Sequence, residues 1–194
     1  MNEKKITDLL YKSFVGKDKE WKPEITGINY FDGYIRATNG FVLAKVHFEE
    51  YDFDLEDRTI AKDGSEVSGK YPTFEKLYSN LEETDVMVSD LFKACKNLPK
   101  GSNKQGEFVV MQIDGFAFHT YQLSAIFELF EIIKEVPGIT TGQSNKQRTL
   151  VFSSSNCTAI CISDFRTLTA KDLIFTLDEA LEFNPAQNKK NGLY

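Results

Sequence analysis

The sequence predicts an α+β fold in which helices lie on one side of antiparallel β-sheet. Three observations support this class. An amphipathic helical segment opens the chain, short runs of β-branched and aromatic residues follow it, and Asp-Gly or Asn-Gly pairs separate those runs. Such pairs favour the tight turns of β-hairpins because they tolerate a positive φ. A similar order of helix and strands returns after residue 80, so we expect a duplicated helix-plus-sheet unit.

The first unit is predicted to be a helix followed by a three-stranded antiparallel meander. Apolar residues recur at helical spacing over about residues 4–15. The strands of the meander are expected at residues 24–30, 34–38 and 41–48. Asp32-Gly33 and Asn39-Gly40 supply the turns between these strands. A hairpin around residues 62–64 and an extended connector at residues 71–80 complete the unit.

The second unit repeats this order with more elements. A helix at about residues 89–98 and a longer one at about 122–135, with an acidic outer face, alternate with strands. The strands are expected at residues 85–88, 107–113, 116–120, 149–153 and 158–163. We therefore divide the chain into one domain and an extension that holds one more strand or helix and a polar tail. The domain is residues 1–165, with halves of about 1–80 and 81–165, and the extension is residues 166–194.

Composition and charge limit the functions that the chain can have. Its 194 residues carry a net charge of −6, which argues against a protein that simply coats nucleic acid. Positive charge nevertheless gathers in residues 1–22 and 89–104, where it can form an anion-binding face on an acidic molecule. Charges interrupt the longest apolar stretch, and the N-terminus lacks an apolar signal core, so we expect a cytoplasmic protein without a membrane partner.

The residues that usually carry chemistry form no recognisable constellation. His47 and His119 lie far apart in predicted strands. Cys95, Cys157 and Cys161 match neither a disulfide framework nor a zinc site. We therefore predict a binding protein with no catalytic residues, no metal and no cofactor, and an enzyme on an α+β fold is the less favoured alternative.

The hairpin of residues 34–44 carries a family resemblance. Its string, Tyr-Ile-Arg-Ala-Thr-Asn-Gly-Phe-Val-Leu-Ala, resembles the "ATDGHRLA" hairpin of the bacterial β sliding clamp (DNA polymerase III β subunit), the processivity ring of replication. Residues 69–74, Gly-Lys-Tyr-Pro-Thr-Phe, are similar to the "GRFPDY" connector between clamp domains. Further similar strings follow in the same order at residues 25–27, 90–94 and 159–162. The resemblance implies a shortened DNA-clamp-like fold, with about one domain's worth of chain where a clamp subunit has three.

The resemblance also implies where partners bind. In the clamp family the hairpin, the connector and the final strand form a pocket for short linear peptides of polymerases and repair proteins. By position, its residues here are Ile25, Thr38, Gly40, Phe41, Val42, Leu43, Pro72, Leu77, Ile160 and Ile162. Clamp helices meet double-stranded DNA through basic residues, without reading its sequence. That role falls here to Lys5, Lys12, Lys93, Lys96 and Lys100.

Two functional hypotheses follow from these observations. In the first, the chain is a clamp-like protein of replication or repair that contacts DNA phosphates through helix lysines and binds a partner's peptide. Encircling DNA would then require a homo-oligomer. In the second, the chain is a protein-interaction module that has lost DNA encirclement. Asn39, Phe41 and Val42 replace the clamp's Asp, His and Arg, so the hairpin tip differs chemically from the family pattern.

Overall fold

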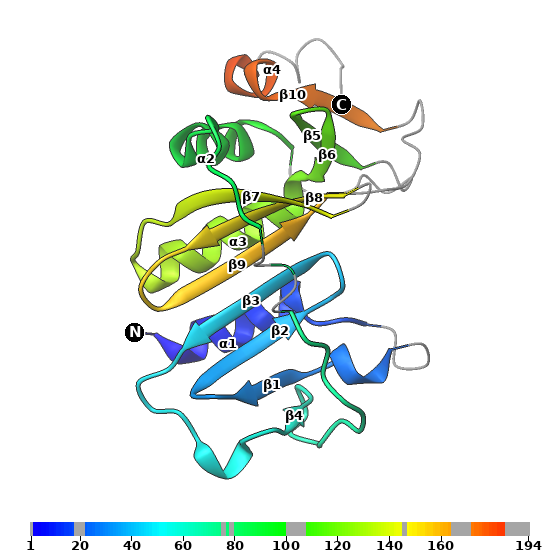
Figure 1. Cartoon of the computed structure of the whole chain (residues 1–194), viewed down its shortest axis with the longest axis vertical. Coiled ribbons are helices and arrows are strands. Elements are labelled where there is room, and N and C mark those ends of the chain that lie inside the picture. The colour runs from blue at the N-terminus through cyan, green and yellow to red at the C-terminus, as the bar shows by residue number, and fades with distance from the viewer. Residues whose placement is uncertain are drawn as a thin grey trace.

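The computed structural model shows a seven-stranded sheet, a three-stranded sheet and helices packed against both (Figure 1). The structure describes residues 2–17, 22–74, 77, 80–99, 108–144, 147–163 and 172–184. The mixture of helices with mainly antiparallel strands confirms the predicted α+β class.

The seven-stranded sheet joins the two halves of the chain. Its order is β4-β1-β2-β3-β9-β8-β7, and every neighbouring pair is antiparallel. The strands are β1 (Ile28–Phe31), β2 (Tyr34–Thr38), β3 (Val42–His47), β4 (Thr59–Ile60), β7 (Gly138–Ser144), β8 (Gln147–Ser153) and β9 (Cys157–Ile162). At the centre β3 pairs with β9, so the meander β1–β3 of the first half meets the meander β7–β9 of the second half in one continuous sheet.

The turns of the hairpins have the backbone that their residues predict. Asp32-Gly33 has φ values of 53° and 73°, and Asp114-Gly115 has φ values of 51° and 78°. Two successive positive φ values are the signature of the type I′ turn that suits the twist of a hairpin. In the turn after β2, the side-chain oxygen of Asn39 accepts the N–H groups of Phe41 and Val42, both at 3.0 Å. These hairpin predictions are confirmed.

Two helices cover one face of the seven-stranded sheet. They are α1 (Glu3–Leu9), which continues as a π-helical turn at Leu10–Phe14, and α3 (Thr120–Ile133). The helices α1 and α3 pack against each other and lie behind the sheet in Figure 1. Each of them precedes a three-stranded meander, α1 before β1–β3 and α3 before β7–β9. The predicted duplication therefore takes the form of a helix followed by a meander.

The smaller sheet has the order β10-β5-β6 and packs beside two further helices. Its elements and helices are β5 (Val109–Ile113), β6 (Phe116–His119), β10 (Leu173–Thr176), α2 (Val88–Asn97) and α4 (Leu177–Glu182). The pair β5–β6 is antiparallel, but β10 pairs with β5 in parallel. Among the described strands, this parallel pair is the exception to the antiparallel arrangement. No helix in the described part of the chain is both long and apolar enough to cross a membrane.

The C-terminal segment folds back onto the second half. The expected single strand or helix at residues 173–183 is a strand and a helix, β10 and α4. The Asn97 side chain, at the end of α2, donates hydrogen bonds to the carbonyl oxygens of Ala180 and Leu181, at 3.1 and 3.0 Å. The division of the chain at residue 165 stays a prediction, and the polar tail beyond Asn184 lies outside the described residues.

The strand predictions differ from the structure in three places. The strand expected at residues 24–30 is the shorter β1, because Pro23–Ile25 form a 3₁₀ turn. Residues 85–88 form no strand; α2 begins at Val88 instead. The sequence pattern also missed β7, whose seven residues, Gly-Ile-Thr-Thr-Gly-Gln-Ser, include two glycines and little apolar alternation. Short 3₁₀ turns at Pro23–Ile25 and Phe53–Leu55 complete the described elements.

The two faces of the large sheet carry separate apolar clusters, because successive strand residues point to opposite sides. Alternate β3 residues, Val42, Ala44 and Val46, belong to the main core under the helices. The intervening Leu43 belongs to a smaller cluster on the opposite face. That cluster consists of Ile25, Leu43, Tyr71, Phe74, Val151 and Ile160, with Leu77, Leu81 and Ile162 packed against it. The connector after Tyr71 thus covers the helix-free face and positions the site described next.

Candidate functional site

A cavity of about 320 Å³, here called the connector groove, lies on the helix-free face beside the β3–β9 junction. Its walls come from the 3₁₀ turn before β1, the β2–β3 hairpin, the connector and the end of β9. The lining residues are Lys22, Glu24, Ile25, Thr38, Gly40, Val42, Leu43, Pro72, Thr73, Phe74, Leu77 and Ile162. The structure therefore brings together eight of the ten residues predicted for a peptide pocket, all except Phe41 and Ile160.

The two remaining residues lie next to the groove rather than in its wall. Ile160 is 0% exposed and lies in the cluster beneath the groove, whereas Ile162, two residues further along β9, reaches its open side. Phe41 is 38% exposed at the hairpin tip, and its carbonyl oxygen accepts the N–H of Ile162 at 2.8 Å. Phe41 thus fixes the hairpin against β9 through its backbone.

Sequence reasoning missed four lining residues. Phe74 and Thr73 belong to the connector string that carries the resemblance, and an apolar residue directly after a Pro-containing turn was the signal available for Phe74. Lys22 and Glu24 come from the turn before β1. Nothing in their local sequence pattern indicates a contact with the connector, because the approach of the two segments is set by the tertiary fold.

Hydrogen bonds hold the hairpin side of the groove in place. The Thr38 hydroxyl donates to the carbonyl oxygen of Val42 at 2.7 Å and accepts the N–H of Gly40 at 3.0 Å. The Asn39 side-chain amide donates to the carbonyl oxygen of Ser13 at 3.2 Å, which ties the tip to the end of the first helix. The wall is therefore organised before any ligand arrives, which reduces the entropy lost on binding.

An aromatic and cationic stack supports the floor of the groove. The Tyr71 ring meets the Phe74 ring edge-on, with centroids 5.8 Å apart. The buried Arg36 guanidinium lies 5.4 Å from the Tyr71 centroid and 4.2 Å from the Phe31 centroid. Its Nε donates to the side-chain oxygen of Asn29 at 3.0 Å. Burial raises the pKa of Tyr71, so its hydroxyl remains neutral beside the cation.

The lysines predicted to contact DNA lie on two helices separated by acidic residues. Lys5 and Lys12 are exposed on α1 and its π-helical turn, and Lys93 and Lys96 are exposed on α2, while Lys100 lies outside the described residues. The helix α3 packs against both α1 and α2 and carries exposed glutamates. Lys96 Nζ lies 3.2 Å from a carboxylate oxygen of Glu131. The proposed phosphate-binding face is therefore interrupted by carboxylates.

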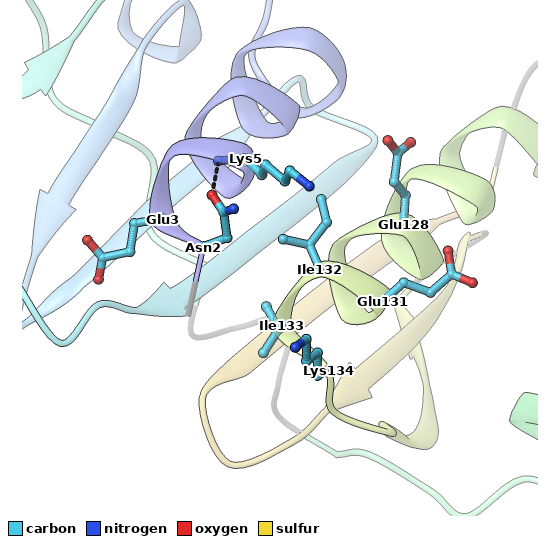
Figure 2. Close-up of a pocket in the computed structure, with 8 residues that line it drawn as sticks. All are labelled: Asn2, Glu3, Lys5, Glu128, Glu131, Ile132, Ile133 and Lys134. Carbon is cyan, nitrogen blue, oxygen red and sulfur yellow. Dashed lines mark hydrogen bonds between the residues drawn. The ribbon is translucent and has the colours of Figure 1, made fainter.

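A larger cavity, of about 760 Å³, separates the start of α1 from the end of α3 (Figure 2). Its lining residues are Asn2, Glu3, Lys5, Glu128, Glu131, Ile132, Ile133 and Lys134. In Figure 2 the Lys5 side chain reaches from α1 toward Ile132, and Glu128 and Glu131 project from α3. Walls with both signs of charge match a polyanion such as the DNA backbone poorly.

The histidines and cysteines stay apart from both cavities. His119 is buried beside the Phe108 and Tyr121 rings, and His47 contacts the Tyr34 ring. All three cysteines are buried free thiols, and burial raises the pKa of Cys157 and Cys161. Within the described ranges, the structure shows no group of three or more His, Cys, Asp or Glu residues arranged to hold a metal ion.

Comparison with known proteins gives matches among solved structures alone: no protein-family model and no curated protein matches the chain. It is similar to the DNA polymerase III beta subunit of Thermotoga maritima, with a TM-score of 0.43, 13% identity, and coverage of 85% of this chain and 63% of that one. It is also similar to the beta chain of Streptococcus pneumoniae, with a TM-score of 0.44, 11% identity, and coverage of 86% and 63%. A Bartonella birtlesii sliding clamp bound to griselimycin matches with a TM-score of 0.21, 12% identity, and coverage of 86% and 31%.

These structures represent the family that the sequence resembles. The chain spans 63% of the length of the first two.

Proposed function

We propose that this chain is a clamp-like binding protein of DNA replication or repair whose connector groove binds a short linear peptide of a partner. One observation supports this function above the others. Eight residues assigned to the pocket by the family resemblance, from segments as far apart as Ile25 and Ile162, line a single cavity. At about 320 Å³ the groove falls near the lower end of the usual volume for ligand sites.

The groove has the chemistry for an apolar anchor with polar flanks. Leu43, Phe74, Leu77 and Ile162 offer the apolar wall that a Leu or Phe side chain of a peptide would bury. Lys22 and Glu24, at the 3₁₀ turn, add one positive and one negative charge to the lining. We therefore assign to this groove a peptide ligand that has one or two apolar anchors with polar neighbours.

We expect Ile162→Asp to weaken the binding of a Gln-Leu-x-Leu-Phe peptide at least about tenfold, because a carboxylate in the wall would be desolvated against the anchor. Ile162 is half-buried at the end of β9, so this change disturbs the core less than one at Leu43, which is 2% exposed. Fluorescence anisotropy of a labelled peptide measures the effect.

The matched control for this experiment is Ile174→Asp, because Ile174 is a strand isoleucine, 41% exposed, on β10. The control should keep the wild-type affinity, and circular dichroism should show both variants folded. Absence of binding to the wild-type protein would remove the peptide function. Equal losses in the two variants would show that the effect is not local to the groove.

A second role, contact with DNA phosphates, rests on the exposure of Lys5, Lys12 and Lys93 on the helices. We expect the double change Lys93→Glu with Lys96→Glu to weaken duplex binding and to reduce the slope of log K against log salt concentration by roughly 2, because each phosphate contact contributes about 0.9. A salt titration followed by fluorescence anisotropy measures both quantities.

The control for the DNA experiment is Lys62→Glu with Lys70→Glu, which alters the net charge equally at exposed positions near β4. This control should change the salt slope less than the α2 variant does. If the wild-type protein fails to bind duplex DNA even at low salt, the alternative of an interaction module without DNA contact holds. The carboxylates on α3 and the mixed charge of the α1–α3 cavity favour that alternative.

A further inference from the structure

The end of the first helix is anchored in the main core. After α1 the chain continues as the π-helical turn Leu10–Phe14, which the Val15 N–H closes by donating to the carbonyl oxygen of Leu10 at 3.1 Å. Phe14 and Val15 are buried in the apolar cluster under the helices. Residues 13–16, here called the helix end, therefore form a fixed point to which other segments of the chain can attach.

The first attachment joins the helix end to the β2–β3 hairpin. The last carbonyl groups of a helix lack partners within the helix, and the Asn39 side-chain amide donates to one of them, that of Ser13, at 3.2 Å. The side-chain oxygen of Asn39 accepts the N–H groups of Phe41 and Val42. Asn39 does not line the connector groove, whereas its neighbours Gly40 and Val42 do. Asn39 therefore acts on the groove by holding the residues beside it.

The second attachment joins the helix end to the 3₁₀ turn before β1. The Gly16 N–H donates to the carbonyl oxygen of Ile25 at 2.7 Å. A Cβ added at Gly16 would lie 2.8 Å from Ile25 Cγ1, so this close approach requires glycine. Ile25 lines the connector groove and belongs to the cluster on its face of the sheet. The helix end therefore contacts a second wall of the same groove.

We propose that the helix end positions two walls of the connector groove, through Asn39 at the hairpin and Gly16 at the 3₁₀ turn. Peptide affinity then depends on two residues that do not themselves line the groove. The physical reason is preorganisation, because a wall that is already held in place loses less entropy when a ligand binds. This inference rests on the peptide-binding function proposed above, and both residues are positioning residues.

The variant Asn39→Asp tests the attachment to the hairpin. A carboxylate still accepts the N–H groups of Phe41 and Val42, and Asp stands at this place in the clamp hairpin, but it has no donor for the carbonyl oxygen of Ser13. We expect Asn39→Asp to bind the Gln-Leu-x-Leu-Phe peptide at least about fivefold more weakly, a factor within the range of one lost hydrogen bond. Fluorescence anisotropy of the labelled peptide measures this change.

The matched control is Asn97→Asp, because the Asn97 amide also donates to carbonyl oxygens, those of Ala180 and Leu181, and lies outside the groove. This variant should lose stability in urea denaturation but keep the peptide affinity within about twofold of wild type. The comparison separates the positioning of the groove from a general loss of stability.

The variant Gly16→Ala tests the attachment to the 3₁₀ turn. Its methyl group would displace Ile25, and we expect the peptide affinity to fall at least about threefold, as overpacking of a close contact predicts. Gly138→Ala is the control, because the nearest atom to a Cβ at Gly138 lies 3.9 Å away, at an ordinary contact distance. The control should keep the affinity within about twofold of wild type.

Circular dichroism verifies that each variant is folded, and Gly16→Ala tests the proposal alone if Asn39→Asp does not fold. Unchanged affinity in a folded Asn39→Asp or in Gly16→Ala would overturn the proposal and leave the peptide function standing. An equal loss of affinity in Asn97→Asp would also overturn it, by assigning the effect to general destabilisation. Absence of binding to the wild-type protein would instead remove the peptide function and this inference with it.

Discussion

Replacing Phe152 with alanine is expected to lower the free energy of unfolding by about 3–5 kcal/mol, the usual cost of removing a large buried aromatic side chain. Phe152 lies on β8 and is 0% exposed. Its ring meets that of Phe127 on α3 edge-on, with centroids 5.5 Å apart. The variant would leave a cavity between the large sheet and the helix, at the centre of the main core.

Urea denaturation followed by circular dichroism measures this loss. Because domains are usually stable by about 5–15 kcal/mol, the variant is expected to retain a folded state with a much lower midpoint. The matched control is Phe53→Ala, at an aromatic residue that is 73% exposed, and it should change stability by less than about 0.5 kcal/mol. A loss for Phe152→Ala similar to that of the control would contradict the position of β8 against α3.

The hairpins could be predicted from the sequence because their signals are local. Asp32-Gly33 and Asp114-Gly115 accept positive φ values at little cost, and the apolar residues on either side alternate with period two. The helices were predicted to within a few residues for the same reason, since α1, α2 and α3 each carry an apolar stripe at helical spacing. Signals of this kind require no knowledge of distant contacts.

Pairing between distant segments could not be predicted in the same way. The junction of β3 with β9 and the parallel pairing of β10 with β5 depend on the tertiary fold. The sequence of a single strand does not indicate which distant strand it pairs with. The strand β7 was not predicted because Gly138 and Gly142 weaken its pattern. Gly142 has a packing reason to be small, since a Cβ added at this position would lie 3.3 Å from Leu81 Cδ2.

The candidate groove was predicted through resemblance rather than through pattern. Two of the predicted residues, Phe41 and Ile160, do not line it. Ile160 shares a face of β9 with Ile162 but is fully buried in the cluster beneath the groove, so alternation along the strand could not separate the two.

Replacing Arg36 with alanine is expected to lower the free energy of unfolding by roughly 3 kcal/mol, from the loss of a desolvated cation–π contact and of hydrogen bonds to a charged group. Arg36 is 8% exposed on β2, with its guanidinium 4.2 Å from the Phe31 centroid. Its removal would also take away the guanidinium N–H groups that donate hydrogen bonds to the side-chain oxygen of Asn29.

The same change is expected to weaken peptide binding in the connector groove about tenfold, because Arg36 supports Tyr71, and Tyr71 in turn supports the lining residue Phe74. Chemical denaturation and peptide anisotropy measure the two effects separately. Arg36→Lys is the control: it keeps the charge but not the planar fork, so it should recover part of the stability. Unchanged stability in Arg36→Ala would contradict the stack. A destabilised variant with full peptide affinity would instead show that the connector holds Phe74 in place without Arg36.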